Sequence, residues 1–186
     1  MILYLHGFRS SPQSAKAQQL AEAARARGIA FASPQLPASP QEAMMLCEEL
    51  LNSSATPVTV VGSSLGGYYA TWLAERHALR AVLVNPAVVA HLDLAPYVGT
   101  LTQFHSGEPF EFTRDHVDEM RALEVTAITR PQRYWLLVEE GDEVLDYRLA
   151  VAKYGGARQT VLAGGDHSFT HWKDYLDDVL RFAAAG

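Results

Sequence analysis

The segment Val60-Val61-Gly62-Ser63-Ser64-Leu65-Gly66-Gly67-Tyr68 decides the fold, because an apolar strand runs through a Gly-x-Ser-x-Gly motif directly into a helix. A serine on such a sharp strand-to-helix turn takes a strained backbone conformation, and the residues two positions away on each side must be small. Gly62 and Gly66 occupy those two positions. We therefore interpret Ser64 as a nucleophile and expect the backbone N–H of Leu65 to stabilise an oxyanion beside it.

The residues on either side of the motif support this interpretation of Ser64. With the usual frequencies of Gly and Ser, three fixed positions arise by chance in a chain of this length with a probability of roughly 0.06. The motif also needs a strand before it and a helix after it. Residues 57–61 have the pattern of a short buried strand, and residues 68–77 contain no helix breaker. The alternative is a glycine-rich turn that only packs.

The composition is that of one globular domain. The chain has 186 residues, of which nearly half are hydrophobic, so we expect a single domain over residues 1–186. A net charge of -6 argues against nucleic acid or an anionic membrane as a partner. No apolar run is long enough to span a membrane, and the first strand begins too early for a signal peptide, so we expect a cytoplasmic protein. Cys47 is the only cysteine and shares an apolar helix face with Met44 and Leu51, which predicts a place in the core.

Strand and helix patterns alternate along the chain. Apolar runs predict six strands, at 2–5, 29–32, 57–61, 81–84, 134–138 and 159–162. Helices are expected before Gly28, from the capping box at 39–42, after Ser64, after Asp142 and in the last stretch of the chain. The strands are continuous rather than alternating apolar runs. This pattern predicts an α/β fold with a parallel sheet buried by helices on both faces.

Residues 87–131 interrupt the alternation. Only one helix is predicted there, at 114–123, with Thr113 as its cap. An insertion of this length within a compact domain usually serves a function, and we interpret it as a small lid. Its aromatic residues Phe110 and Phe112 are candidates for the walls of a substrate pocket, although packing against the sheet would explain them equally well.

Four loops that leave the carboxyl ends of expected strands carry chemically reactive side chains. They hold His6, Ser64, Asp142 and His167, and parallel α/β sheets form their sites at that edge. A serine hydroxyl needs an adjacent base and a third group that orients the base. In one known arrangement these groups follow in the order serine, acid, histidine, and Ser64, Asp142 and His167 occur in that order.

Other histidines and other acidic residues could take the roles assigned to His167 and Asp142. His167 is chosen among seven histidines because it alone combines a glycine-rich loop, a late position and a preceding strand. His167, His171 and Asp166 could instead form a metal site, but no third basic or thiolate ligand is visible. Asp142 lies in a turn just past a strand, where it could also cap a helix. The other acidic residues near it are Glu139, Glu140, Glu143 and Asp146.

The loop His6-Gly7-Phe8 is expected to complete an oxyanion hole. Gly7 lets the backbone turn tightly at the end of the strand, so that the N–H of Phe8 faces the reacting oxygen opposite that of Leu65. We expect His6 to shape this loop by hydrogen bonding rather than to transfer protons. Arg9 is either an attractor for an anionic group of the substrate or a solvated loop side chain.

As a whole, the chain resembles the YqiA-like esterases of the α/β-hydrolase superfamily. The resemblance rests on residues 4–8, 11–12, 14–17, 34–37, 61–72, 84–87, 141–148 and 164–167, and Asp166 stands where relatives are expected to have Asn. It implies a compact α/β-hydrolase fold that lacks the first two strands of the full superfamily sheet and has the sheet order 2-1-3-4-5-6. It also implies esterase activity on small acyl esters or thioesters.

These observations predict a serine hydrolase that forms an acyl-enzyme on Ser64 and needs no metal or organic cofactor. Its partner would be a small-molecule ester or thioester. Two alternatives use the same fold. One is a binding protein that has lost catalysis, since a fold does not secure a function. The other is an acyltransferase that passes the acyl group to an alcohol or a carrier instead of water.

Overall fold

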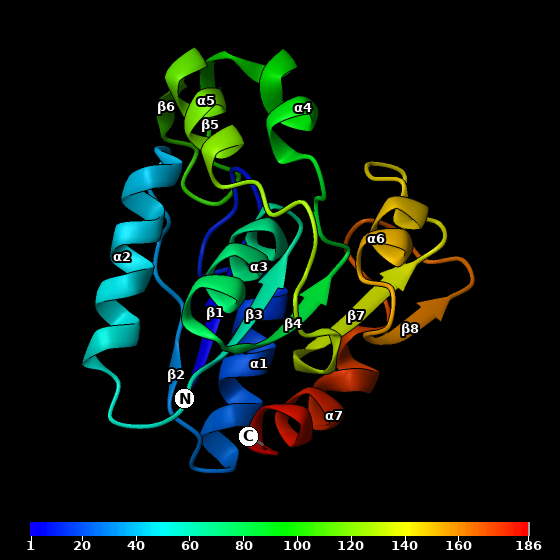
Figure 1. Cartoon of the computed structure of the whole chain (residues 1–186). Helices are drawn as coiled ribbons and strands as arrows, with labels where there is room; N and C mark the ends of the chain where they lie inside the picture. The colour runs from blue at the N-terminus through cyan, green and yellow to red at the C-terminus, as the bar shows by residue number, and fades with distance from the viewer. Residues whose placement is uncertain (186) are drawn as a thin grey trace.

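Six parallel strands form the centre of the fold (Figure 1). The computed structural model describes residues 1–185, and its central strands are β1 (Ile2–Leu5), β2 (Phe31–Ala32), β3 (Thr59–Ser63), β4 (Arg80–Val84), β7 (Tyr134–Glu139) and β8 (Arg158–Leu162). Their order is β2-β1-β3-β4-β7-β8, with parallel pairing throughout. This is the expected order 2-1-3-4-5-6. The labels differ only because two hairpin strands lie between β4 and β7 in the chain.

The edge strand β2 is shorter than the sequence indicated. Only Phe31 and Ala32 pair with β1, opposite Ile2 and Leu3. The N–H of Ile29, expected in the strand, instead donates to the carbonyl oxygen of Ala24 at 2.9 Å. The start of the predicted strand therefore completes the end of the preceding helix.

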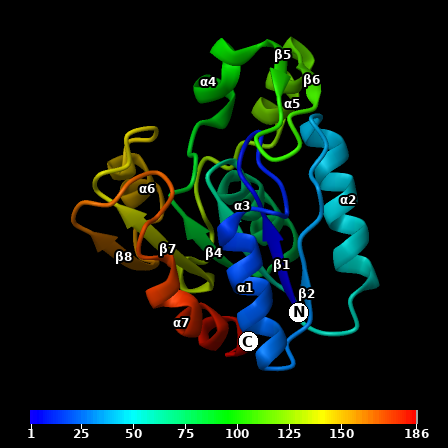
Figure 2. The ribbon, with the colours of Figure 1, turned by 180° about the vertical axis from the view of Figure 1, so that it is seen from behind.

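Helices cover both faces of the sheet, as predicted (Figures 1 and 2). One face carries α1 (Ala15–Ala26) and α7 (Trp172–Ala184), and the other carries α2 (Pro40–Ser53), α3 (Leu65–His77) and α6 (Tyr147–Lys153). Each face has its own cluster of buried apolar side chains. Cys47 of α2 is fully buried in one of them, which confirms its place in the core. No helix within residues 1–185 combines the length and the apolar composition that crossing a bilayer requires.

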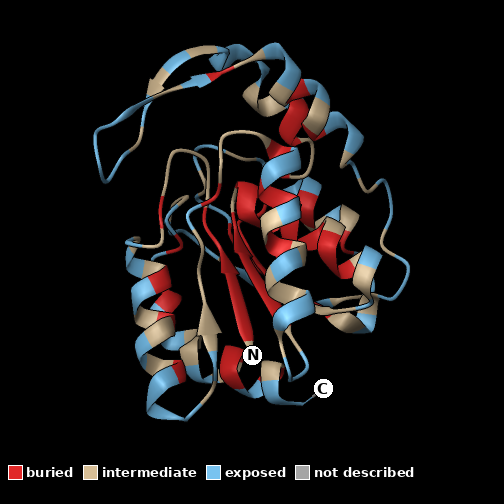
Figure 3. Cartoon of the chain, turned by 90° about the vertical axis from the view of Figure 1, so that its left-hand side faces the viewer, coloured by how far each residue is buried: buried red, intermediate tan, exposed pale blue. Residues whose placement is uncertain are grey.

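The segment 87–131 lies over the carboxyl ends of the central strands (Figures 1 and 3). It contains α4 (Ala90–Leu94), η1 (Ala95–Tyr97), an antiparallel hairpin of β5 (Gly99–Thr102) and β6 (Pro109–Phe112), α5 (Arg114–Ala122) and the beginning of η2 (Pro131–Arg133). The predicted helix at 114–123 is thus present, and the hydroxyl of Thr113 caps it by accepting from the N–H of His116. The hairpin was not predicted, because its strands are only four residues long and half of their residues are exposed.

Candidate active site

Ser64 lies on the strained turn that the motif predicted. Its φ of 56° and ψ of -122° place it between β3 and the first residue of α3. A Cβ atom at Gly62 would lie 2.1 Å from the carbonyl oxygen of Gly66, and one at Gly66 would lie 2.0 Å from that of Leu5. Only glycine fits at either position, because the strand, the helix and β1 pack backbone against backbone there.

The hydroxyl of Ser64 is hydrogen-bonded to His167, and His167 is hydrogen-bonded to Asp142. Ser64 Oγ is 3.0 Å from His167 Nε2, and His167 Nδ1 is 2.9 Å from both carboxylate oxygens of Asp142. A carboxylate accepts only, so Nδ1 carries the proton and Nε2 is free to accept from the serine hydroxyl. The fold therefore brings together three side chains from the ends of β3, β7 and β8.

Asp142 is the acidic residue that reaches the imidazole. Its side chain is 2% exposed, and its Oδ1 also accepts the N–H groups of Val144 and Leu145 at 2.9 Å each. Burial acts to raise the pKa of Asp142, but the hydrogen bonds from His167 and from this turn outweigh it and hold the pKa below its usual range. The cap of α6 is Asp146 and not Asp142.

The loop after β1 runs directly beside Ser64. A Cβ atom at Gly7 would lie 3.2 Å from the Cβ of Ser64 and 3.6 Å from its Oγ. The backbone N–H groups of Phe8 and Leu65 donate to no acceptor within residues 1–185. Unpaired backbone N–H groups are the kind of donor that an oxyanion hole uses, and Leu65 directly follows Ser64 in the chain.

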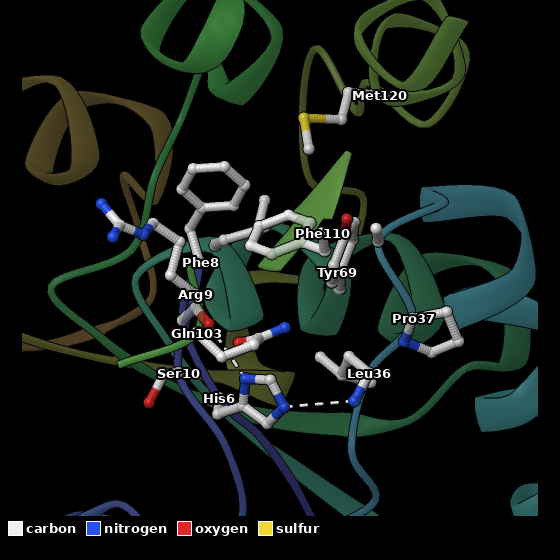
Figure 4. Close-up of a pocket in the computed structure, with 13 residues that line it drawn as sticks. His6, Phe8, Arg9, Ser10, Leu36, Pro37, Tyr69, Gln103, Phe110 and Met120 are labelled. Carbon is white, nitrogen blue, oxygen red and sulfur yellow. Dashed lines mark hydrogen bonds between the residues drawn. The ribbon is translucent and has the colours of Figure 1, made fainter. Parts of the chain in front are cut away.

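His6 fixes the path of this loop. Its Nε2 accepts the N–H of Leu36 at 3.1 Å, so Nδ1 carries the proton and donates to the carbonyl oxygen of Gly7 at 2.9 Å (Figure 4). Burial lowers the pKa of the His6 imidazole, which favours the neutral form. The hydrogen bonds agree with the expected structural role of His6.

Arg9 is half-buried and is held by the β5–β6 hairpin. Its Nε donates to the carbonyl oxygen of Thr102 at 2.7 Å, and its guanidinium lies 4.3 Å from the ring centroid of Phe104. The N–H of Phe104 in turn donates to the carbonyl oxygen of Arg9 at 2.8 Å. Arg9 therefore joins the loop after β1 to the β5–β6 hairpin.

A cavity of about 680 Å³ opens at Ser64 and His167, which is within the usual size range of small-molecule sites. Part of its wall is apolar and comes from the segment 87–131, through Leu94, Tyr97 and Phe104. The cavity also reaches Lys16 at the start of α1.

Phe110 and Phe112 do not line this cavity, contrary to expectation. Phe112 is 1% exposed, and its ring lies 5.0 Å from that of Phe8. Phe110 lines a smaller, adjoining cavity of about 30 Å³, beside Tyr69 and Met120 (Figure 4). Both side chains project from the same face of β6 toward Phe8, so packing accounts for them.

Two buried residues that the sequence did not single out for this role hold the loop that carries His167. Glu139, at the end of β7, is fully buried and accepts the N–H groups of Asp166, Thr170 and His171 at 2.8–3.0 Å. Asn85, at the end of β4, donates to the carbonyl oxygen of Asp166 at 3.0 Å. In the sequence, Glu139 and Asn85 are visible only as polar residues at the end of an apolar strand. Their partners are backbone groups of a loop that is distant in the chain, so the sequence alone does not reveal their role.

Comparison with known proteins identifies relatives by sequence and by fold. The sequence model of the Uncharacterised protein family UPF0227 matches residues 1–184. A protein from Agrobacterium vitis S4 superposes with a TM-score of 0.79 at 21% identity, covering 97% of this chain and 86% of that chain. Mouse alpha/beta hydrolase domain-containing protein 10 superposes with a TM-score of 0.74 at 18% identity, covering 97% of this chain and 89% of the mouse protein. The monoacylglycerol lipase of Paleococcus ferrophilus superposes with a TM-score of 0.74 at 15% identity, covering 97% of this chain and 92% of the lipase. The fold is thus that of the α/β hydrolases.

Proposed function

Because the chain belongs to the Uncharacterised protein family UPF0227, the YqiA family, and has the side-chain arrangement described above, we propose that it is a serine hydrolase. It would cleave small carboxylic esters or thioesters through an acyl-enzyme on Ser64. The family membership confirms the resemblance found in the sequence. The observation that carries the proposed activity is the unbroken series of hydrogen bonds from Ser64 through His167 to Asp142.

Hydrolysis would proceed in two acyl-transfer steps. Ser64 Oγ attacks the carbonyl carbon while His167 Nε2 takes the hydroxyl proton, and the N–H groups of Phe8 and Leu65 stabilise the oxyanion. The bond to the leaving oxygen or sulfur then breaks, and His167 returns the proton to that atom. Asp142 keeps the imidazole oriented and stabilises its charged form. Water attacks the acyl-enzyme by the same route and releases the acid and the free serine.

The segment 87–131 would act as a small lid that supplies the acyl pocket. Leu94, Tyr97 and Phe104 form an apolar wall of the cavity at Ser64, and this wall would hold the acyl chain of the substrate. Closing a site with apolar side chains also removes water from the reacting groups and strengthens the electrostatic interactions inside.

The direct test replaces Ser64 with Ala. We expect Ser64→Ala to abolish hydrolysis of p-nitrophenyl butyrate while the circular dichroism spectrum and melting temperature stay close to wild type. Ser53→Ala, at an exposed serine of α2, is the matched control and should keep full activity. A fluorophosphonate probe should label wild-type protein at Ser64 and fail to label Ser64→Ala.

Two outcomes would contradict the proposal. Hydrolysis by Ser64→Ala at the wild-type rate would remove the serine from the reaction. Wild-type protein that neither hydrolyses esters nor reacts with the probe would be a binding protein with the hydrolase fold.

Added methanol distinguishes the acyltransferase alternative, since a transferase would form the methyl ester in preference to the acid.

A further inference from the structure

The cavity at Ser64 has a polar wall opposite in character to the proposed acyl pocket. This wall comes from the start of α1, where Ser14 caps the helix and Lys16 lies in its first turn. The buried residues Tyr4 and Ser63 line the same cavity. Arg9 also lines the cavity, but its guanidinium is engaged by Thr102 and the ring of Phe104 beside the apolar wall. A substrate that fills the cavity therefore meets apolar side chains at one part and the ammonium group of Lys16 at another.

Lys16 is only partly satisfied by its surroundings. Its ammonium group donates to the carbonyl oxygen of Ser168 at 2.6 Å and forms no ion pair among the described residues. An ammonium group has three N–H donors, so two remain for another acceptor. Burial lowers the pKa of Lys16, and the nearby carboxylates of Asp166, Glu139 and Asp142 act in the opposite direction. Because a charge held partly out of water is costly, an anion that met these donors would be bound favourably.

The position of Lys16 indicates which half of the substrate it would meet. The histidine of such a triad returns its proton to the leaving group, so the leaving half of the ester lies against the loop that carries His167. Lys16 contacts Ser168, the residue after His167. Two carboxylates also line the cavity. Glu143 accepts the N–H of His167, on the same loop, and Asp93 lies on α4 beside the apolar wall.

We propose that Lys16 binds an anionic group, a carboxylate or a phosphate, on the alcohol or thiol half of the substrate. This inference rests on the proposed hydrolase function and adds a substrate class to it. The enzyme would select esters that have an apolar acyl half and a charged leaving half.

Matched esters with one acyl group test this selection. Butyrate esters of 4-hydroxybenzoate, 4-hydroxybenzamide and 4-hydroxyphenyl phosphate differ in the charge of the leaving half, and hydrolysis can be followed by chromatography of the released phenol. For wild-type protein we expect kcat/KM for the carboxylate or the phosphate ester to exceed that for the carboxamide ester at least tenfold, mainly through KM. Added salt should reduce this ratio, because it screens the charge of Lys16.

Two variants separate binding from folding. Lys16→Met keeps the length of the side chain and removes its charge, and it should bring the ratio of charged to neutral ester close to one. Lys16→Arg should retain most of the preference. Lys173→Met, at an exposed lysine of α7, is the control and should leave the ratio as in wild type.

The possible results have distinct meanings. A preference for only one of the two anions supports the proposal and identifies the group that is bound. Equal kcat/KM for all three esters in wild-type protein overturns it while the hydrolase function stands, and so does a loss in Lys16→Met that is equal for the charged and neutral esters. Absence of hydrolysis of every ester, together with no fluorophosphonate labelling of Ser64, overturns the proposed function itself.

Discussion

At the scale of single residues, Asp142 has two tasks that one carboxylate can perform together. It orients His167 through Nδ1, and it closes its own turn by accepting the N–H groups of Val144 and Leu145. The hydrogen bonds that lower its pKa keep it ionised at neutral pH, so it can accept from all three donors at once. An amide at this position would keep a single acceptor oxygen.

We expect Asp142→Asn to lower kcat by about 10⁴-fold, because the amide nitrogen cannot accept from Nδ1–H and the imidazole takes the wrong tautomer. The turn can survive on the remaining oxygen, so the melting temperature should change little. Glu140→Gln is the control, since Glu140 is exposed and accepts only from the hydroxyl of Tyr147. Hydrolysis of p-nitrophenyl butyrate measures both variants. A comparable loss in Glu140→Gln, with Asp142→Asn active, would assign the acid to Glu140.

The sequence could identify these residues because their signals are local. Gly62 and Gly66 lie within two residues of Ser64 and mark the turn in the sequence, although the backbone that a Cβ at Gly66 would meet belongs to Leu5 of β1. Asp142 and His167 each follow an apolar strand. Glu139 lacked such a signal. It is the last residue of an apolar run, and its partners are backbone groups 27 to 32 residues away in the chain. Which loop it supports depends on the fold.

At the scale of elements, the loop between β8 and α7 depends on Glu139. This fully buried carboxylate accepts the N–H groups of Asp166, Thr170 and His171 and the side chain of His171. A Cβ atom at Gly165 would lie 1.8 Å from Glu139 Oε2, so the loop closes tightly over it. Burial alone would raise the pKa of Glu139, but these hydrogen bonds lower it to about 2.

Because the pKa of Glu139 is lowered in the folded state, its contribution to the free energy of unfolding depends on pH. A carboxyl group whose pKa is lower in the folded state stabilises the fold above its unfolded pKa and loses that contribution as the pH falls toward the folded value. For Glu139 the window runs from the ordinary pKa of 4.5 down to about 2, and this difference corresponds to about 3 kcal/mol. We expect Glu139→Gln to lose stability of this order at pH 7 and to approach wild type as the pH falls below 4.

Urea unfolding at pH 7, 5 and 3 measures this difference in the free energy of unfolding. Glu22→Gln, at an exposed residue of α1, provides the control and should match wild type at each pH. A difference between wild type and Glu139→Gln that stays the same at all three pH values would show that the charge of Glu139 is not its cause.

At the scale of the whole molecule, the alternation of strands and helices could be predicted but the placement of the segment 87–131 could not. The sheet follows from continuous apolar runs, and the edge of a parallel sheet then brings Ser64, Asp142 and His167 together. The β5–β6 hairpin has short strands, half of whose residues are exposed, and its contacts with Arg9 and Phe8 join residues about 90 or more positions apart. The spacing of apolar residues along the sequence does not predict contacts between residues so far apart.

The packing of Phe110 and Phe112 against Phe8 leads to the last prediction. Without the hairpin, any aromatic residue of the segment could face the substrate. In the structure Tyr97 and Phe104 line the cavity at Ser64, whereas Phe112 packs under Phe8. We therefore expect Tyr97→Ala and Phe104→Ala to shift the preferred acyl length of p-nitrophenyl esters toward longer chains, because each truncation removes part of the apolar wall and enlarges the cavity.

Phe112→Ala should act through stability instead. Removing a fully buried aromatic side chain costs about 3–5 kcal/mol, and the melting temperature should fall accordingly. The preferred acyl length should nevertheless stay that of wild type, as measured by kcat/KM for acetate through decanoate esters at a temperature where the variant is folded. If Phe112→Ala shifts the preferred length while Tyr97→Ala and Phe104→Ala do not, the acyl chain lies beneath Phe8 and the cavity at Ser64 holds only the leaving half.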